Sequence, residues 1–276
     1  MALAALVVAS AFVHALWNAL VRLEPDKDSA IVAVMATSAA SAALVAVVQA
    51  ALGTAPLPTA AAAGWGALAG LAEGGYFAAL ARGLTIGPLG TVYTVSRGGA
   101  IALVWPVSLL WLGEPLTAAS AAGTVVVVAG LAAIGLERGA SRAAVGWALA
   151  AAVCIAVYHV AYKLGLAAGA SPAGVFTLSL TVASVCNLLR YARRGLRARS
   201  ERLPRLIAIG LLCAASFLLF LIALARGGAG YVLTLRNTSV LFAIGMAWAI
   251  GDRPGARQLV GAALVAAGAV LLGLGR

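Results

Sequence analysis

The chain has 276 residues, of which 63% are hydrophobic and only 10% are charged. Soluble globular domains contain about 45–50% apolar and about 25% charged residues, so this composition excludes an ordinary soluble domain and indicates a protein embedded in lipid. The net charge of +11 does not indicate nucleic-acid binding, because the cations lie mostly in short gaps between apolar segments.

Ten apolar segments follow one another along the chain. Each is close to the roughly 20 residues that a helix needs to cross about 30 Å of hydrocarbon. No basic residue precedes the first segment, which favours a spanning helix over a cleaved signal peptide. The segments span residues 2–21, 29–51, 61–81, 88–112, 117–136, 143–164, 172–191, 204–225, 229–250 and 255–275. We therefore expect an all-α membrane protein with ten transmembrane helices.

The connections between these segments are short, and only residues 191–205 form a substantial polar stretch. Its many arginines predict a topology determinant that also contacts anionic lipid headgroups. The chain leaves no room for a soluble catalytic domain and has no Walker lysine loop, HExxH or GxSxG motif. The sequence therefore predicts neither an enzyme nor an ATP-driven pump, and it predicts no cofactor.

Short motifs of the first half recur in the second half at nearly constant offsets, which indicates duplication of a five-helix unit. Because five is odd, the second copy must enter the membrane from the opposite side. This predicts an inverted repeat, with units 1–138 and 139–276, as in many secondary transporters. The matching positions are Leu80–Gly83 with Leu224–Gly227, Arg97 with Arg236, Glu114 with Asp252, and His14 with His159.

The distribution of Lys and Arg predicts the orientation of the chain. The loops after the odd-numbered segments hold 14 of the 19 cations and the opposite side holds three, while Arg97 and Arg236 lie inside segments. The positive-inside rule then places the odd-numbered loops in the cytoplasm and both termini outside.

Arg97 and Arg236 lie well inside the fourth and ninth segments. Intramembrane ionisable residues are rare and usually face a cavity or a partner. Bonds to backbone carbonyls or to Glu73 would give the arginines a structural role in locking helices. Alternatively, they bind an anionic group of a substrate, because the planar guanidinium stays charged and grips carboxylate or phosphate with two bonds. Asn237, beside Arg236, is a further candidate for substrate binding.

Glu73 is the one acidic residue deep within any apolar segment. A carboxyl in a dehydrated site takes up a proton more readily than it does in water, so Glu73 is a candidate for coupling transport to protons. It could equally neutralise Arg97, and the two roles are compatible. The pair Gly74–Gly75 beside it would let a helix or ligand approach the backbone.

Two helix faces combine polar and aromatic residues at spacings of three and four, as expected for the lining of a central cavity. Trp17 and Tyr162 could instead anchor at the membrane interface, and Lys163 could extend from a helix end to water. His14 is a second candidate for handling protons. The histidines lack the Cys or carboxylate spacing of a metal site. The faces are His14, Trp17 and Asn18 in the first segment and His159, Tyr162 and Lys163 in the sixth.

Two acidic motifs follow the fourth and ninth segments: Gly113-Glu114-Pro115 and Gly251-Asp252-Arg253-Pro254. They predict helix breaks at the membrane surface, with each acid capping the helix that follows. Together with His14-Ala-Leu-Trp17-Asn18 and two inverted five-helix halves, these motifs resemble the drug/metabolite transporter superfamily, EamA type.

The resemblance implies a secondary transporter of small metabolites, often an exporter, with a central cavity formed by helices 1, 3, 4, 6, 8 and 9. It adds Tyr76 and Tyr93 to the candidate lining. It also implies cytoplasmic termini, against the charge count.

We expect a multi-pass carrier of the cell's inner membrane, monomeric or homodimeric, whose partners are the bilayer and a small-molecule substrate. The substrate bears an anionic group, as an amino acid, organic acid or phosphorus-containing metabolite does, because the cations near the expected cavity outnumber Glu73. Two alternatives stay open. A multidrug exporter of cationic apolar compounds would use Glu73 and the aromatic faces, and a membrane scaffold would not transport at all.

Overall fold

The computed structural model describes residues 2–25, 27–87, 89–135, 141–192, 202–249 and 255–274. Helices make up almost all of these residues, and none of the described residues forms a strand. The helices are α1 Ala2–Arg22, α2 Lys27–Ala51, α3 Ala60–Ile86, α4 Leu89–Leu110, α5 Ala118–Gly135, α6 Arg142–Ala167, α7 Pro172–Ala192, α8 Leu203–Arg226, α9 Ala229–Arg236, α10 Ser239–Ala249 and α11 Ala256–Leu274. The expected all-α class is confirmed.

The ninth apolar segment is two helices, where the sequence predicts one. α9 ends at Arg236, and α10 begins at Ser239. At the break, the amide of Asn237 donates to Thr234 O and the amide of Thr238 donates to Leu235 O, both at 3.1 Å. These bonds to the third preceding residue tighten the last turn and end the regular helix. The short polar residues at 237 and 238 favour such a break.

Five of the described helices are long and apolar enough to cross a membrane: Ala2–Val21, Ala30–Ala51, Arg142–Ala167, Pro172–Leu189 and Leu203–Arg226. Shorter apolar stretches cover Thr94–Leu110, Ala118–Ile134 and Ala256–Leu272. The outer surface carries large apolar side chains such as Leu44 and Val47, which are 65% and 64% exposed. Hydrocarbon is the solvent that such a surface requires.

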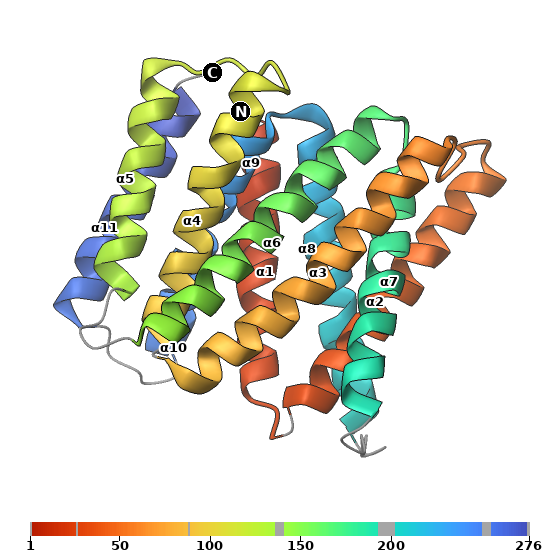
Figure 1. Cartoon of the computed structure of the whole chain (residues 1–276), viewed down its shortest axis with the longest axis horizontal. Helices are drawn as coiled ribbons and strands as arrows, with labels where there is room; N and C mark the ends of the chain where they lie inside the picture. Colours follow the sequence, from red (N-terminus) through yellow and green to blue (C-terminus); the bar gives the residue numbers. More distant parts are fainter. Residues whose placement is uncertain are drawn as a thin grey trace.

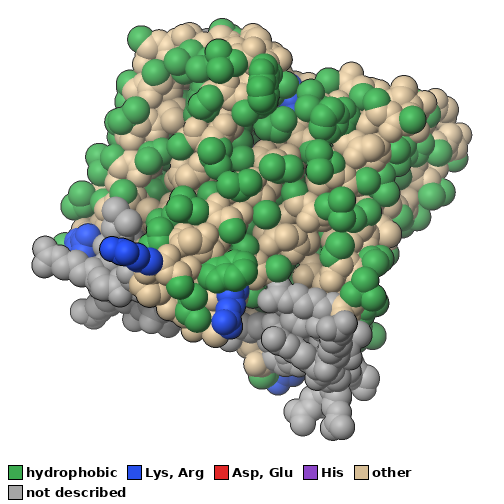
Figure 2. All heavy atoms as spheres, in the orientation of Figure 1, with side chains coloured by type: hydrophobic (Ala, Val, Ile, Leu, Met, Phe, Trp, Pro, Cys, Tyr) green, Lys and Arg blue, Asp and Glu red, His purple; other side chains and the backbone are tan. Residues whose placement is uncertain are grey.

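Both chain termini lie at one end of the bundle, at the top of Figure 1. The opposite, lower end is where helices α1, α3, α5, α7 and α10 end. Figure 2 shows that most Lys and Arg side chains visible on this face gather along the lower edge. The described Lys and Arg side chains on this face therefore lie mainly at the end opposite the termini, as the charge count predicts.

Several pairs of helices are in close contact. α3 packs against α6 and α7, while α8 packs against α1 and α2. α2 also packs against α7, and α4 against α6. α5 and α11 form a close pair at one edge of the molecule (Figure 1).

Glycines allow two of these contacts to be unusually close. A Cβ added at Gly70 on α3 would lie 2.5 Å from the carbonyl oxygen of Ser179 on α7. A Cβ at Gly130 on α5 would lie 2.7 Å from the carbonyl oxygen of Gly261 on α11. Any side chain at these positions would force the helices apart, so small residues set the spacing of both pairs.

Glu114 does not cap the helix that follows it, which corrects the sequence-based expectation. Its carboxylate accepts hydrogen bonds from the amides of Ala229, at 2.5 Å, and Gly230, at 3.3 Å, and so caps α9 of the other half. The following helix, α5, is capped by Thr117, whose hydroxyl accepts from the amide of Ser120 at 3.1 Å. Gly113, directly before Glu114, has a φ of +63°, a backbone conformation that favours glycine. The matching Asp252 lies outside the described residues.

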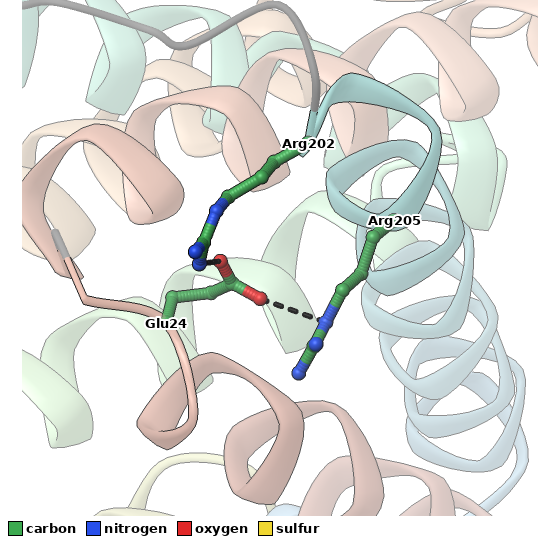
Figure 3. A network of polar contacts seen from close by, with 3 residues as sticks. All are labelled: Glu24, Arg202 and Arg205. Carbon is green, nitrogen blue, oxygen red and sulfur yellow. Dashed lines mark hydrogen bonds and ion pairs between the residues drawn. The ribbon is translucent and has the colours of Figure 1, made fainter.

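A second polar contact joins the halves at the lower end of the bundle. Glu24, between α1 and α2, forms ion pairs with Arg202 at 3.3 Å and Arg205 at 2.8 Å, at the start of α8 (Figure 3). The Glu24 side chain is 2% exposed, whereas both arginines remain nearly half exposed. Much of the expected polar stretch 191–205 lies outside the described residues, but its last part serves this ion-pair cluster.

Candidate functional site

Arg97 and Arg236 meet at a single histidine. A terminal guanidinium nitrogen of Arg97 lies 3.4 Å from Nε2 of His14, and one of Arg236 lies 3.5 Å from Nδ1 of the same ring. The three residues come from α4, α9 and α1. Residues 83 and 222 positions apart in the sequence are thus brought together. We call these three side chains the arginine–histidine cluster.

His14 cannot accept a hydrogen bond from both arginines at once. A neutral imidazole has one N–H and one acceptor nitrogen, so His14 can accept from only one of the two guanidinium groups. At its other nitrogen, two N–H donors face each other. The Nε atom of Arg236 is buried without a hydrogen-bond partner among the described residues. An oxygen-bearing anion would supply the acceptors that this arrangement lacks.

Arg236 is 3% exposed, and three features offset the cost of burying its charge. It is the last residue of α9, where the negative end of the helix dipole favours a cation. Its guanidinium carbon also lies 4.6 Å from the ring centre of Phe217 and 4.2 Å from that of Phe220, both on α8. These are cation–π distances. No carboxylate forms an ion pair with Arg236 within the described part of the chain.

Glu73 accepts hydrogen bonds from two residues that the sequence did not predict to lie beside it. Its Oε1 accepts from the Tyr162 hydroxyl at 2.9 Å, and its Oε2 accepts from the Ser179 hydroxyl at 2.8 Å. The two hydroxyls lie 2.8 Å from each other. Glu73 is 3% exposed, Tyr162 and Ser179 are fully buried, and the three come from α3, α6 and α7. We call this arrangement the carboxyl–hydroxyl ring.

His159 is fully buried between aromatic rings. Its ring centre lies 4.6 Å from that of Tyr158 and 5.0 Å from that of Phe220. Nδ1 lies 2.9 Å from the carbonyl oxygen of Ile155, so in a neutral ring this nitrogen carries the hydrogen and donates. Nε2 has no hydrogen-bond partner among the described residues. Both histidines therefore reach the same Phe217–Phe220 region from opposite halves.

Three other predicted binding residues make structural contacts. The Lys163 ammonium donates to the carbonyls of Leu224, at 3.0 Å, and Gly227, at 2.7 Å, at the end of α8. The amide groups of Asn18 and Asn237 each donate to a carbonyl one turn earlier, at 2.7 and 2.8 Å. For these residues, a role in substrate binding stays a prediction. The contacts of Lys163 and Asn237 lie at helix ends, and that of Asn18 lies within α1.

Among the other aromatic candidates, Trp17 and Tyr76 pack against neighbouring rings. Trp17 is 9% exposed and meets His14 edge to face at 5.4 Å between ring centres. Tyr76 packs on Phe77 and Tyr158, at 5.2 and 6.1 Å. Tyr93 lies on α4, but its side chain is outside the described part of the structure. The burial of Trp17 and Tyr162 disfavours the alternative that they anchor at the membrane interface.

Sequence reasoning missed Ser179, Phe217 and Phe220. Serine and phenylalanine are common in spanning helices, so no local pattern distinguishes them. Their importance depends on which helices pack against Glu73 and Arg236. The inverted-repeat expectation alone could not supply that pairing at the level of side chains.

Comparison with known proteins gives a family match and a similar fold. Residues 142–274 match the model of the EamA-like transporter family. A solved structure described as "Crystal structure of protein" resembles the chain with a TM-score of 0.76 at 19% identity, over 99% of this chain and 95% of the other. At that identity the likeness concerns the fold alone. A search of curated proteins found no match.

The apolar helices and the family match together define a multi-pass membrane transporter of the drug/metabolite type. The part of the chain that is similar to the EamA-like transporter family is its second half, residues 142–274. The resemblance noted from the sequence is confirmed.

Proposed function

We propose that this protein is a secondary transporter that exports a small metabolite bearing an anionic group across the inner membrane. The observation that carries the proposal is the arginine–histidine cluster, where two guanidinium groups converge on one imidazole that can accept only one hydrogen bond. A carboxylate or phosphate between the arginines would accept from both and balance their charge. Arg97 is only partly buried, in contrast to the buried Arg236.

The proposed mechanism is alternating access by two inverted five-helix units, 1–138 and 139–276. Exchanging each helix for its counterpart turns the contact of α3 with α6 into that of α8 with α1, and the contact of α3 with α7 into that of α8 with α2. A Cβ added at Gly123 would lie 2.7 Å from Gly268 O, matching Gly130 and Gly261 under the offset of Glu114 and Asp252. This packing supports a two-fold relation in the membrane plane.

The bundle is closed at both ends in a way that fits an occluded intermediate of such a cycle. Glu24 ties the first half to α8 at the lower end, and Glu114 ties it to α9 on the side of the termini. His14, Glu73 and Arg236, between these contacts, are each less than 9% exposed. Opening either end to let substrate pass would break the contact at that end.

Transport by reconstituted protein tests the proposal. Proteoliposomes containing the wild type should accumulate carboxylate or phosphate metabolites from a panel and leave cationic dyes behind. Replacing Arg97 or Arg236 by Gln should reduce anion transport at least tenfold, because each removes one of the two charged forks. Arg226→Gln is the matched control, since this arginine is exposed at the end of α8. Unchanged anion transport in both cluster variants, or transport of cationic dyes alone, would overturn the proposal.

A further inference from the structure

The distances within the carboxyl–hydroxyl ring bear on the protonation state of Glu73. Its three contacts join Glu73 Oε1 to Tyr162 Oη, Tyr162 Oη to Ser179 Oγ, and Ser179 Oγ to Glu73 Oε2, all between 2.8 and 2.9 Å. Each distance is that of a good O–H···O hydrogen bond, and each such bond needs one hydrogen. The three side chains are all buried, and neither hydroxyl has a hydrogen-bond partner outside the ring among the described residues.

Counting hydrogens shows which protonation state fits the ring. Tyr162 supplies one hydroxyl hydrogen and Ser179 supplies another, so an ionised Glu73 leaves three contacts with two hydrogens. One pair of oxygens would then face each other at hydrogen-bond distance with no hydrogen between them. A protonated Glu73 supplies the third hydrogen, and the ring closes with every contact satisfied.

We propose that Glu73, Tyr162 and Ser179 form a proton-binding site, with the proton held on the Glu73 carboxyl in this conformation and Tyr162 and Ser179 as its positioning residues. When the proton leaves to water, both hydroxyls donate to the carboxylate. These two charge-assisted bonds stabilise the ionised form in a site that excludes water. The Tyr162–Ser179 contact then has no hydrogen, and its two oxygens repel each other. Loss of the proton therefore loosens α6 from α7.

Other titratable or charged groups lie on the helices that surround Glu73. They include Tyr76 on α3, Cys154, Tyr158, His159 and Lys163 on α6, Cys186 on α7, Cys213 on α8, Arg97 on α4 and Arg236 on α9. The titration of Glu73 is therefore measured in the presence of these groups.

The close approach of α3 and α7 is what allows the ring to form. Gly70 lies three residues before Glu73, on the same face of α3, and lets the backbone of Ser179 come within contact distance of the helix. Gly74, on the other side of Glu73, allows the same approach at Cys186, which lies 3.0 Å from the position of an added Cβ. Ser179 is short, so its hydroxyl reaches a carboxylate on α3 only across this narrow gap.

Infrared difference spectroscopy on the purified wild-type protein in lipid nanodiscs tests the inference directly. Raising the pH should remove the C=O stretching band of a protonated carboxyl, and Glu73→Gln should lack that band. Tyr162→Phe and Ser179→Ala should each shift the midpoint of this titration, because each opens the hydrogen-bonded ring of the protonated form and removes one hydrogen bond to the ionised form.

Matched controls separate the ring from general effects of the substitutions. Tyr158→Phe makes the same change one turn earlier on α6, at a residue that is 4% exposed and outside the ring. Ser184→Ala is the control for Ser179→Ala on α7, because the Ser184 hydroxyl has no hydrogen-bond partner among the described residues. Both should titrate as the wild type does. A carboxyl band that Glu73→Gln leaves in place, or ring variants that titrate with an unchanged midpoint, would overturn the inference.

The inference rests on the proposed function only for its use in coupling transport to protons, because the infrared titration requires neither substrate nor transport. A ring that fails to titrate would leave the anion site at Arg97 and Arg236 standing. Conversely, if the protein transports no anion but shows the Glu73 band, the proton site is supported and the proposed substrate class is wrong.

Discussion

At the scale of single residues, the arrangement around His14 explains how two arginines can be kept inside an apolar bundle. Arg236 is tolerated because the end of α9 and two aromatic faces offset its charge. These compensations are incomplete, since its Nε stays unbonded in the described structure. Buried polar groups without partners are costly, so they mark positions where a ligand can contribute binding free energy.

Lys163 provides a test at this scale, because sequence and structure suggest different roles for it. Its ammonium bonds to the last carbonyls of α8, which would otherwise lack donors. Lys163→Met should therefore lower the stability of the protein by about 1–3 kcal/mol, since two hydrogen bonds to a charged group are lost. Thermal unfolding in detergent measures this change.

A substrate-binding role for Lys163 predicts a further effect of the same substitution. If Lys163 binds substrate, the methionine variant should also lose the thermal stabilisation that a transported anion produces, which is about 2.7 kcal/mol at 100 times Kd. We expect this ligand-induced shift to be retained. Exposed Arg142, at the start of α6, offers a control in Arg142→Met.

At the scale of elements, the break between α9 and α10 positions Arg236. A continuous helix over the ninth segment would have placed this arginine in mid-helix, with its charge away from any helix end. The break converts the position into a helix C-terminus. Transporters commonly use interrupted helices near the membrane centre for this purpose. The apolar pattern continues through the break, which is why the sequence predicted one helix.

The spacing of α3 and α7 gives a prediction at this scale. Gly70→Ala would place a Cβ 2.5 Å from a backbone oxygen of α7, so the helices must separate. We expect a loss of about 1–3 kcal/mol from overpacking, measured by thermal unfolding. We also expect the infrared band of Glu73 to shift, because Ser179 is carried away from the carboxyl.

Gly64→Ala is the control on the same helix, because nothing lies within 4 Å of its added Cβ. It should leave both the unfolding midpoint and the infrared band near their wild-type values. Equal behaviour of the two variants would mean that the contact of α3 with α7 does not depend on Gly70.

At the scale of the whole molecule, the two ends differ in charge and in the contact that closes them. The end that carries the exposed arginines is held by the ion pairs of Glu24, and the end that carries the termini is held by Glu114 on the amides of α9. Because the cytoplasmic loops of membrane proteins carry an excess of Lys and Arg, we expect the end with the exposed arginines to lie in the cytoplasm.

Cysteine labelling in intact cells tests that orientation, using the two ends of α2. Leu52→Cys, after α2 on the side of the termini, should react with a maleimide that does not cross membranes, because that position is 80% exposed. Leu23→Cys, before α2 and 59% exposed, should react only after the cells are opened. The wild type, with its three native cysteines, supplies the background. The reverse pattern would place the termini in the cytoplasm.

The sequence by itself determined the class of protein, the approximate extent of its helices and the family that it resembles. These properties follow from local hydropathy and short motifs, since the cost of unsatisfied backbone groups in lipid makes any long apolar segment helical. Local charge also marked Arg97, Arg236 and Glu73 as exceptional, because a charge in hydrocarbon is costly wherever the helix packs.

Only the tertiary structure decided what those residues meet. Glu73 finds Ser179 across 106 positions of sequence, Arg236 finds His14 across 222, and Glu114 caps a helix 115 positions away. The contacts depend on helix pairing, on the tight approach at Gly70 and on the break after Arg236. Packing in lipid selects helix partners by close fit of side chains and by interhelical hydrogen bonds, which hydropathy does not encode.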